Sequence, residues 1–390
     1  MESNPFLGVM LHAIGGLAAA SFYIPYKRVK GWAWENYWLA GGFFSWIVAP
    51  WVLAMIILPQ TPAILGAAPG KALFWTWFFG VLWGIGGLTF GLTMRYLGIA
   101  LGYAIALGLC AAFGTLVPPI FKGEFMQILT TGSGQVILLG VVVCLGGIAL
   151  SGKAGISKER ELSDEQKQES VTEFSFVKGV IVAIIAGMLS AAMAYAFAAG
   201  KPIAEAALAQ GAPPLWQNLP ILIVALFGGF VTNCIWCLGL SIKNKTWGEY
   251  FGKVANHLPA RDKETIIETV TDAPGEEMAE AMPQADTGTV TEPPLLRNYI
   301  FCALGGVTWY LQFFFYGMGS TQMGAYDFSS WTLHMASIII FSTIWGIALK
   351  EWKGTSKATH MWIALGLVVL ILSTMVIGYG NTLGAGATGH

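Results

Sequence analysis

Long apolar runs, separated by short polar stretches, follow one another along the whole chain. Each run approaches the ~20 residues that an α-helix needs to cross a bilayer. The pattern therefore predicts an all-α membrane protein with ten transmembrane helices. We place them at 5–25, 35–58, 72–95, 96–119, 134–152, 175–199, 215–242, 297–319, 327–350 and 358–380.

Two longer polar segments interrupt this pattern. Residues 153–174 are charged and nearly free of large apolar side chains, which is typical of a solvated linker. The second segment, 243–296, contains an acidic portion at 264–292 that we expect to be disordered or weakly helical. The linker separates two groups of five helices, 1–152 and 175–390. An odd number of helices per group inverts the second group relative to the first, which predicts a five-plus-five inverted repeat.

Composition agrees with a membrane protein. Of the 390 residues 55% are hydrophobic and 11% are charged, against about 25% charged in soluble domains. The net charge of −1 says nothing about partners, and we expect no nucleic-acid partner. All five cysteines fall inside predicted spans, and Cys234 and Cys237 have metal or redox spacing without a second ligand pair. We therefore expect no disulfide framework, metal or cofactor.

The basic residues are distributed unevenly between the two sides of the membrane. Eighteen of the 21 Lys and Arg residues fall in loops on one side. The other side, which carries both termini, has only Lys71, Lys122 and Lys201. Basic loops stay in the cytoplasm. Both termini are therefore predicted to be periplasmic.

The stretch from Leu304 to His334 concentrates polar and aromatic side chains within an apolar run. It predicts two helices, with a break around Gly317, Gly319 and Ser320 and a second helix beginning at Asp327. A polar group in the bilayer costs a few kcal/mol, so such residues usually face the bundle interior. Aromatic rings beside hydrogen-bonding groups suit an uncharged polyol such as a sugar. For any single residue, helix packing or anchoring at the membrane interface is an equal alternative.

Position along the helices gives these residues a common depth. His12, Gln312 and His334 each lie about seven residues from the outer end of their helix, hence ~10 Å deep at ~1.5 Å per residue. Trp83 and Trp309 fall just below. Three helices thus bring polar side chains to one layer near the membrane centre, where transporters bind substrate. The candidate substrate-binding residues are His12, Tyr23, Trp83, Trp309, Tyr310, Gln312 and His334.

Proton coupling needs a titratable group in or near this layer. Asp327, His12 and His334 are the candidates. We expect Asp327 to carry the proton and the histidines to bind the substrate; the reverse assignment is the alternative. Glu35 and Arg95 lie level with each other at the inner face and form a possible inner gate, although Arg95 is equally explained by snorkelling toward the interface.

Several blocks of sequence resemble the L-rhamnose–proton symporter family of the drug/metabolite transporter superfamily. They are FYIPYKRVKGWAWE (22–35), GLTMRYLG (91–98), WYLQFFFYGMG (309–319), YDFSSWTLHM (326–335) and LKEW (349–352). The resemblance spans nearly the whole chain. It implies ten helices in an inverted repeat and uptake of a 6-deoxyhexose with a proton across a bacterial inner membrane.

The sequence leaves three functions open for this chain. The first is a sugar–proton symporter, working by alternating access, with a small sugar, a proton and the lipid bilayer as partners. The second is an exporter or facilitator of another small metabolite on the same fold, since a fold does not fix a substrate. The third is an intramembrane enzyme or receptor. Because the chain has no second ligand pair to complete a metal site with Cys234 and Cys237, no G-x-S-x-G motif and no phosphate loop, we expect that it is not an enzyme.

Overall fold

A computed structural model describes residues 3–97, 99–161, 176–253, 294–350 and 352–387. These residues contain ten helices that are long and apolar enough to cross a membrane, and no strand. The ten predicted spans are confirmed, each to within a few residues at most ends. The first five are built from α1 (Pro5–Ser21) with α2 (Tyr23–Tyr26), α3 (Trp34–Phe43) with η1 (Phe44–Val48) and α4 (Ala49–Ile57), α6 (Gly70–Leu97), α7 (Ile99–Phe121) and α9 (Gly132–Glu161).

The remaining spans follow the linker, and short helices connect the spans in both halves. The spans are α11 (Phe176–Ser190) with α12 (Ala192–Ala199), α14 (Leu219–Lys243), α17 (Leu295–Ser320), α18 (Ser330–Ala348) and α19 (Lys357–Ala387). The short helices are α5 (Thr61–Ala67), α8 (Phe125–Thr130), α13 (Lys201–Ala209), η2 (Pro214–Trp216), η3 (Trp247–Phe251) and η4 (Gly324–Ser329).

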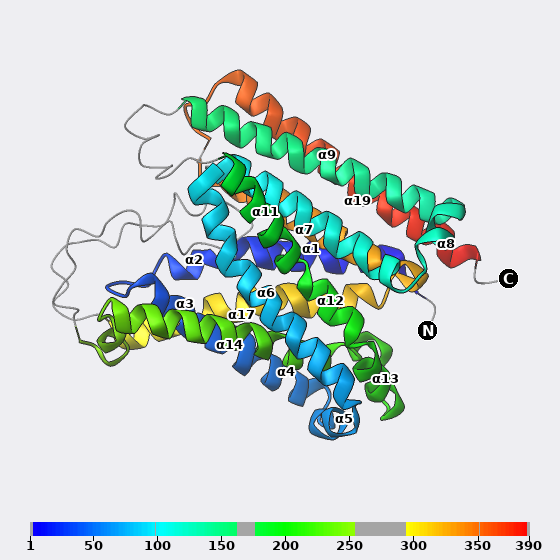
Figure 1. Cartoon of the computed structure of the whole chain (residues 1–390), viewed down its shortest axis with the longest axis horizontal. Helices are drawn as coiled ribbons and strands as arrows, with labels where there is room; N and C mark the ends of the chain where they lie inside the picture. Colours follow the sequence, from blue (N-terminus) through cyan, green and yellow to red (C-terminus); the bar gives the residue numbers. More distant parts are fainter. Residues whose placement is uncertain (1–2, 98, 162–175, 254–293, 351, 388–390) are drawn as a thin grey trace.

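The spans pack mostly across the two halves of the chain. Helix α1 packs against α17 and α18, while α11 packs against α6 and α7. Helices α9 and α19 lie side by side along one edge of the bundle (Figure 1). Helix α3 contacts both α14 and α17, and α14 also contacts α6. Each half therefore completes its packing only with the other half.

Small residues allow the backbones to approach at these crossings. A Cβ added at Gly15 would lie 2.9 Å from the carbonyl oxygen of Gln312, and one added at Gly16 would lie 2.4 Å from Cβ of Ser337. Neither position has room for a side chain without a shift of α17 or α18. Glycine thus holds α1 in close contact with two helices at once, as is common in membrane bundles.

The break predicted around Gly317, Gly319 and Ser320 is present but begins after Ser320, so it was placed slightly too early. Helix α17 runs through both glycines to Ser320, and α18 begins at Ser330, after the 3-10 helix η4 that contains Asp327. The glycines serve packing instead. A Cβ at Gly319 would lie 2.9 Å from the His12 ring, and the Gly317 carbonyl accepts a hydrogen bond of 2.8 Å from the side chain of Asn218.

The ends of the bundle differ in character. Both chain termini lie at the same end, near α8, whereas α2 and the start of α3 lie at the opposite end, where Lys27 and Arg28 fall (Figure 1). Helix α9 continues to Glu161, into the segment predicted as linker. The rest of that linker and the acidic portion at 264–292 lie outside the described residues.

Candidate functional site

Two histidines lie on either side of one tyrosine ring in the middle of the bundle. His12 of α1 and His334 of α18 lie with their ring centroids 5.4 Å and 5.2 Å from that of Tyr316 of α17. Both histidines are fully buried, and their four ring nitrogens have no hydrogen-bond partner among the described residues. The close crossing at Gly15 and Gly16, one turn along α1, brings His12 to this position.

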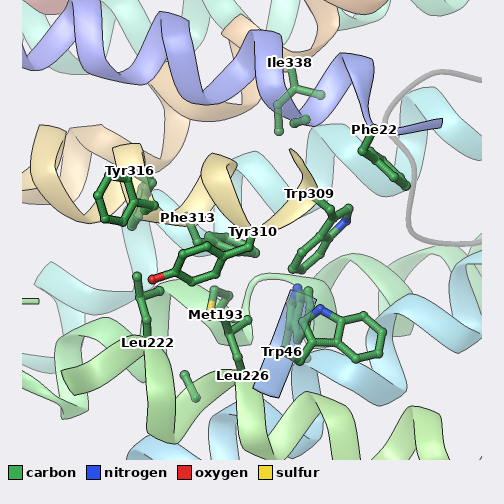
Figure 2. Packing of buried hydrophobic residues seen from close by; sticks show 14 of the residues in the cluster. Phe22, Trp46, Met193, Leu222, Leu226, Trp309, Tyr310, Phe313, Tyr316 and Ile338 are labelled. Atoms are coloured by element: carbon green, nitrogen blue, oxygen red, sulfur yellow. The ribbon is translucent and has the colours of Figure 1, made fainter. Parts of the chain in front are cut away.

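A group of aromatic rings continues the site toward the basic end. The Trp309 ring of α17 lies 5.6 Å from the Trp46 ring of η1 and 5.6 Å from the Trp83 ring of α6. Phe313 contacts Trp309 at 5.3 Å and His334 at 5.8 Å, so it joins the aromatic group to the histidines. Figure 2 shows Trp46 and Trp309 facing one another, with Phe313 and Tyr310 beside them on α17.

Several polar atoms in this region are buried without a partner in the described part of the chain. They include the indole nitrogens of Trp46 and Trp309 and the hydroxyl of Tyr310, which Figure 2 shows directed toward Leu222 of α14. A buried group without a hydrogen bond costs about 1–3 kcal/mol. Gln312 is also buried, with 5% of its surface exposed. Such a set suits a ligand that carries several hydroxyl groups and an apolar face.

The rings around the histidines carry no formal charge. Besides Tyr316, the rings in contact with His334 are Phe313 and Trp331. The Trp331 indole is held in place by a hydrogen bond of 3.1 Å that its N–H donates to the backbone carbonyl of Cys110. Within the described residues no three His, Cys, Asp or Glu side chains gather as a metal site. The side chains of this region can therefore form hydrogen bonds, stack on a ligand and protonate at imidazole.

Of the predicted substrate residues, six fall in this region, and Tyr23 lies at its basic edge. Tyr23 stacks on Trp38 at 6.4 Å, and Trp38 in turn contacts Trp46 at 6.0 Å. The Trp38 ring thus lies between Tyr23 and the group of Trp46, Trp83 and Trp309. The six are His12, Trp83, Trp309, Tyr310, Gln312 and His334.

The other predicted residues lie apart from the central layer. Asp327 is exposed in η4 at the end that carries the termini, within electrostatic range of Lys122, Lys201 and Glu124 and also of Tyr316. At the basic end, Glu35 is buried and accepts hydrogen bonds from Thr246 and Asn244. The side chain of Arg95 lies outside the described part of the structure, so its predicted pairing with Glu35 stays a prediction.

Sequence reasoning missed Trp46. It lies in a π-helical turn, Phe44–Val48, that interrupts the second span. A π turn has no reliable sequence signature, and it changes which side chains face the bundle. One signal was available: Gly42 precedes Trp46 by four residues, the spacing at which a ring folds back over the preceding turn of a helix.

Comparison with known proteins identifies the family of the chain. The profile of the L-rhamnose-proton symport protein family matches residues 1–248 and 280–383. The chain belongs to this family. It is 37% identical over 387 residues to the L-rhamnose-proton symporter of Pectobacterium atrosepticum, covering 97% of this chain and 99% of the relative.

Other relatives carry the same name. The L-rhamnose-proton symporter of Shigella flexneri is 36% identical over 381 residues, covering 97% of this chain and 99% of the relative. That of Salmonella gallinarum is 36% identical over 383 residues, covering 98% and 100%. The family profile leaves 249–279 unmatched, within the long polar segment that the sequence singles out.

Proposed function

We propose that the chain takes up L-rhamnose together with a proton, by alternating access across the bacterial inner membrane. Full-length similarity to L-rhamnose-proton symporters supports this function, and the site agrees with it. The observation that carries the proposal is the buried layer of unpartnered polar groups beside a wall of indole rings. The hydroxyls of a deoxy sugar can pair with these polar groups, and its C–H surface can stack on the indole rings.

An exporter or facilitator of other metabolites on the same scaffold fits less well. Such a transporter would favour a more apolar site without a protonatable group. Here His12 and His334 are both buried in the central layer. An enzyme has no support in the site, and the family consists of transporters.

We also propose the five-plus-five inverted repeat, of the kind found in the drug/metabolite transporter superfamily. The packing supports it. In such a repeat each span of the first half corresponds to the span five places later in the chain. The contact of α1 with α17 then corresponds to that of α11 with α6, and the contact of α1 with α18 corresponds to that of α11 with α7. The pair α9 and α19 maps onto itself. A two-fold relation between the halves has this consequence.

For orientation, we propose that both termini face the periplasm. The distribution of Lys and Arg supports this assignment, since basic loops stay in the cytoplasm. The site then lies nearer the outer side, and the end containing α2 and η3 is cytoplasmic.

For the proton, the geometry favours the histidines over Asp327. His12 and His334 lie in the substrate layer, whereas the Asp327 side chain lies in η4 at the outer mouth and is exposed. Two imidazolium ions on either side of Tyr316 would repel each other in a medium of low dielectric constant. The pair therefore holds one proton at most, and Asp327 lies where it can collect protons from outside.

The test of the proposed function is uptake of labelled L-rhamnose into proteoliposomes in which the orientation of the protein is controlled. Uptake is measured with and without an uncoupler. Accumulation that the uncoupler abolishes is expected. The variants Gln312→Leu and Trp309→Ala should weaken sugar affinity by about 1–3 kcal/mol each, through a lost hydrogen bond and lost stacking surface. Absence of rhamnose uptake by the folded wild-type protein would refute the proposal.

A further inference from the structure

The second span is not a continuous α-helix. Residues Phe44–Val48 form a π-helical turn between α3 and α4. Such turns are rare and frequently occur at functional sites, because the inserted residue redirects the side chains around it. In this turn Trp46 is buried, with 2% of its surface exposed. The turn packs against α17 and α14. It therefore delivers a large aromatic side chain to the centre of the bundle.

Glycines fix the position of the Trp46 ring. A Cβ added at Gly306 of α17 would lie 2.2 Å from the carbonyl oxygen of Gly41, so the backbones of α3 and α17 are in contact there. A Cβ added at Gly42 would lie 2.5 Å from the Trp46 ring. The ring thus folds back over Gly42, beside the crossing of the two helices. Trp309 lies one turn beyond Gly306 on α17, and the two indoles meet at 83°.

The indole N–H of Trp46 is the feature that packing does not explain. It is buried and has no acceptor among the described residues. Two other buried indoles in the spans are satisfied: Trp38 donates to Asn233 at 3.2 Å, and Trp331 donates to the Cys110 carbonyl at 3.1 Å. A phenylalanine would fill a purely apolar position without burying a donor.

Four other tryptophans also have a buried N–H without an acceptor in the described structure. Three of them, Trp32, Trp34 and Trp352, lie at or beyond the ends of the spans at the basic end of the bundle. The fourth is Trp309, the ring that Trp46 faces. Among the described residues away from the ends of the spans, the two indole donors without an acceptor therefore occur together, next to the proposed substrate layer.

We propose that Trp46 binds the sugar directly: its indole N–H donates a hydrogen bond to one sugar oxygen, and its ring, with Trp83 and Trp309, covers the C–H face. This inference rests on the proposed function. It adds a substrate-binding residue in the first half of the chain, opposite α17. It also gives the π turn a role, since a continuous α-helix would rotate Trp46 away from Trp309.

The experiment measures binding of L-rhamnose and of its monodeoxy analogues to purified wild-type protein and to Trp46→Phe. The variant keeps an aromatic ring and removes the N–H. We expect its affinity for L-rhamnose to fall about tenfold, the usual consequence of losing one hydrogen bond. One analogue, lacking the oxygen that accepts from Trp46, should bind wild type and variant equally. The control is Trp345→Phe, which removes a structural N–H outside the site, the donor to Ser21, and should not change the ranking of the analogues.

A second pair of variants tests the position of the ring with the indole intact. Gly42→Ala places a methyl group where the Trp46 ring lies, and should weaken rhamnose binding. Gly66→Ala in α5 is the matched control, because a Cβ there meets nothing within 4 Å.

Three results are distinguished. Equal rhamnose affinity of wild type and Trp46→Phe, or an equal loss for every analogue, would make Trp46 a packing residue and overturn the inference. Unchanged binding in Gly42→Ala would overturn it as well. Failure of wild-type protein to bind rhamnose at all would instead refute the proposed function.

Discussion

The carboxylate of Glu249 accepts a hydrogen bond of 2.7 Å from the side-chain amide of Asn36, although the two residues belong to different halves of the chain. Glu249 also accepts from the backbone N–H of Ala33. Close by, Glu35 accepts from Thr246 at 2.8 Å. All of these residues are buried. Together they join the loop before α3 to the segment after α14 and close the basic end of the bundle.

This network predicts a defect in gating when Glu249 is replaced. Glu249→Ala removes the acceptor of the Ala33 N–H and one of the two acceptors of the Asn36 amide, so the packing of the basic end is destabilised. We expect counterflow exchange of rhamnose to persist while uphill accumulation falls severalfold. Glu249→Gln, which keeps one acceptor oxygen, should show a smaller loss. Glu205→Gln in α13 serves as the control. Normal accumulation in Glu249→Ala would mean that the network is only structural.

The proton-coupling residues are separated by comparing exchange with accumulation. If the histidine pair holds the proton, His12→Gln or His334→Gln should abolish pH-driven accumulation, and any remaining exchange should lose its dependence on pH. Asp327→Asn should slow uptake at neutral pH without abolishing accumulation. The opposite outcome, in which Asp327→Asn exchanges sugar but cannot accumulate it, would return the coupling role to Asp327.

A carboxylate outside the membrane predicts a pH dependence of stability. Hydrogen bonds from the Ser356 and Thr359 hydroxyls hold the pKa of Glu161 at about 2, below its usual value of 4.5. Because the folded pKa is lowered, the stabilisation is present above pH 4.5 and is lost as the pH falls toward 2. Glu161 thereby ties α9 to the start of α19, with Ser356 Oγ at 2.6 Å.

The measurement is thermal unfolding of purified Glu161→Gln and wild type across this pH range. The variant should unfold at a lower temperature at pH 7, and the difference should shrink as the pH approaches 2. Glu124→Gln, at the exposed N-terminus of α8, is the control, because its side chain makes no capping bond. A difference that does not change with pH would show that the hydrogen bonds to Glu161 do not depend on its charge.

Orientation is tested with fusions to a reporter that is active only in the periplasm. Because 18 of the 21 Lys and Arg residues lie on the predicted cytoplasmic side, a fusion after His390 should be active and one near Asp164 inactive. Activity in the reverse pattern would place the termini in the cytoplasm.

The spans and much of the site follow from the sequence, for physical reasons. A bilayer demands long apolar helices, so their number could be predicted, and depth along the helix placed His12, Gln312 and His334 near one another. Contacts between distant segments could not be predicted in the same way. Thr246 and Glu35, for example, are 211 residues apart in the chain.

Local backbone geometry was the second limit. The π turn at Trp46 arises where α3 crosses α17 and has no simple pattern of residues. The break after α17 was placed a few residues too early, at its glycines, for a related reason. Gly317 and Gly319 can break a helix, but here they provide close contacts within one. Whether a glycine ends a helix or allows close packing depends on the helix that lies against it.

The most direct test of proton-coupled rhamnose transport is to drive protons with sugar. Coupling is reciprocal, so a gradient of L-rhamnose must move protons even when no proton gradient is imposed. Proteoliposomes containing the chain and an internal pH dye, with the membrane potential clamped, should acidify inside when rhamnose is added outside. Sucrose should have no effect. Entry of rhamnose without internal acidification would contradict the account.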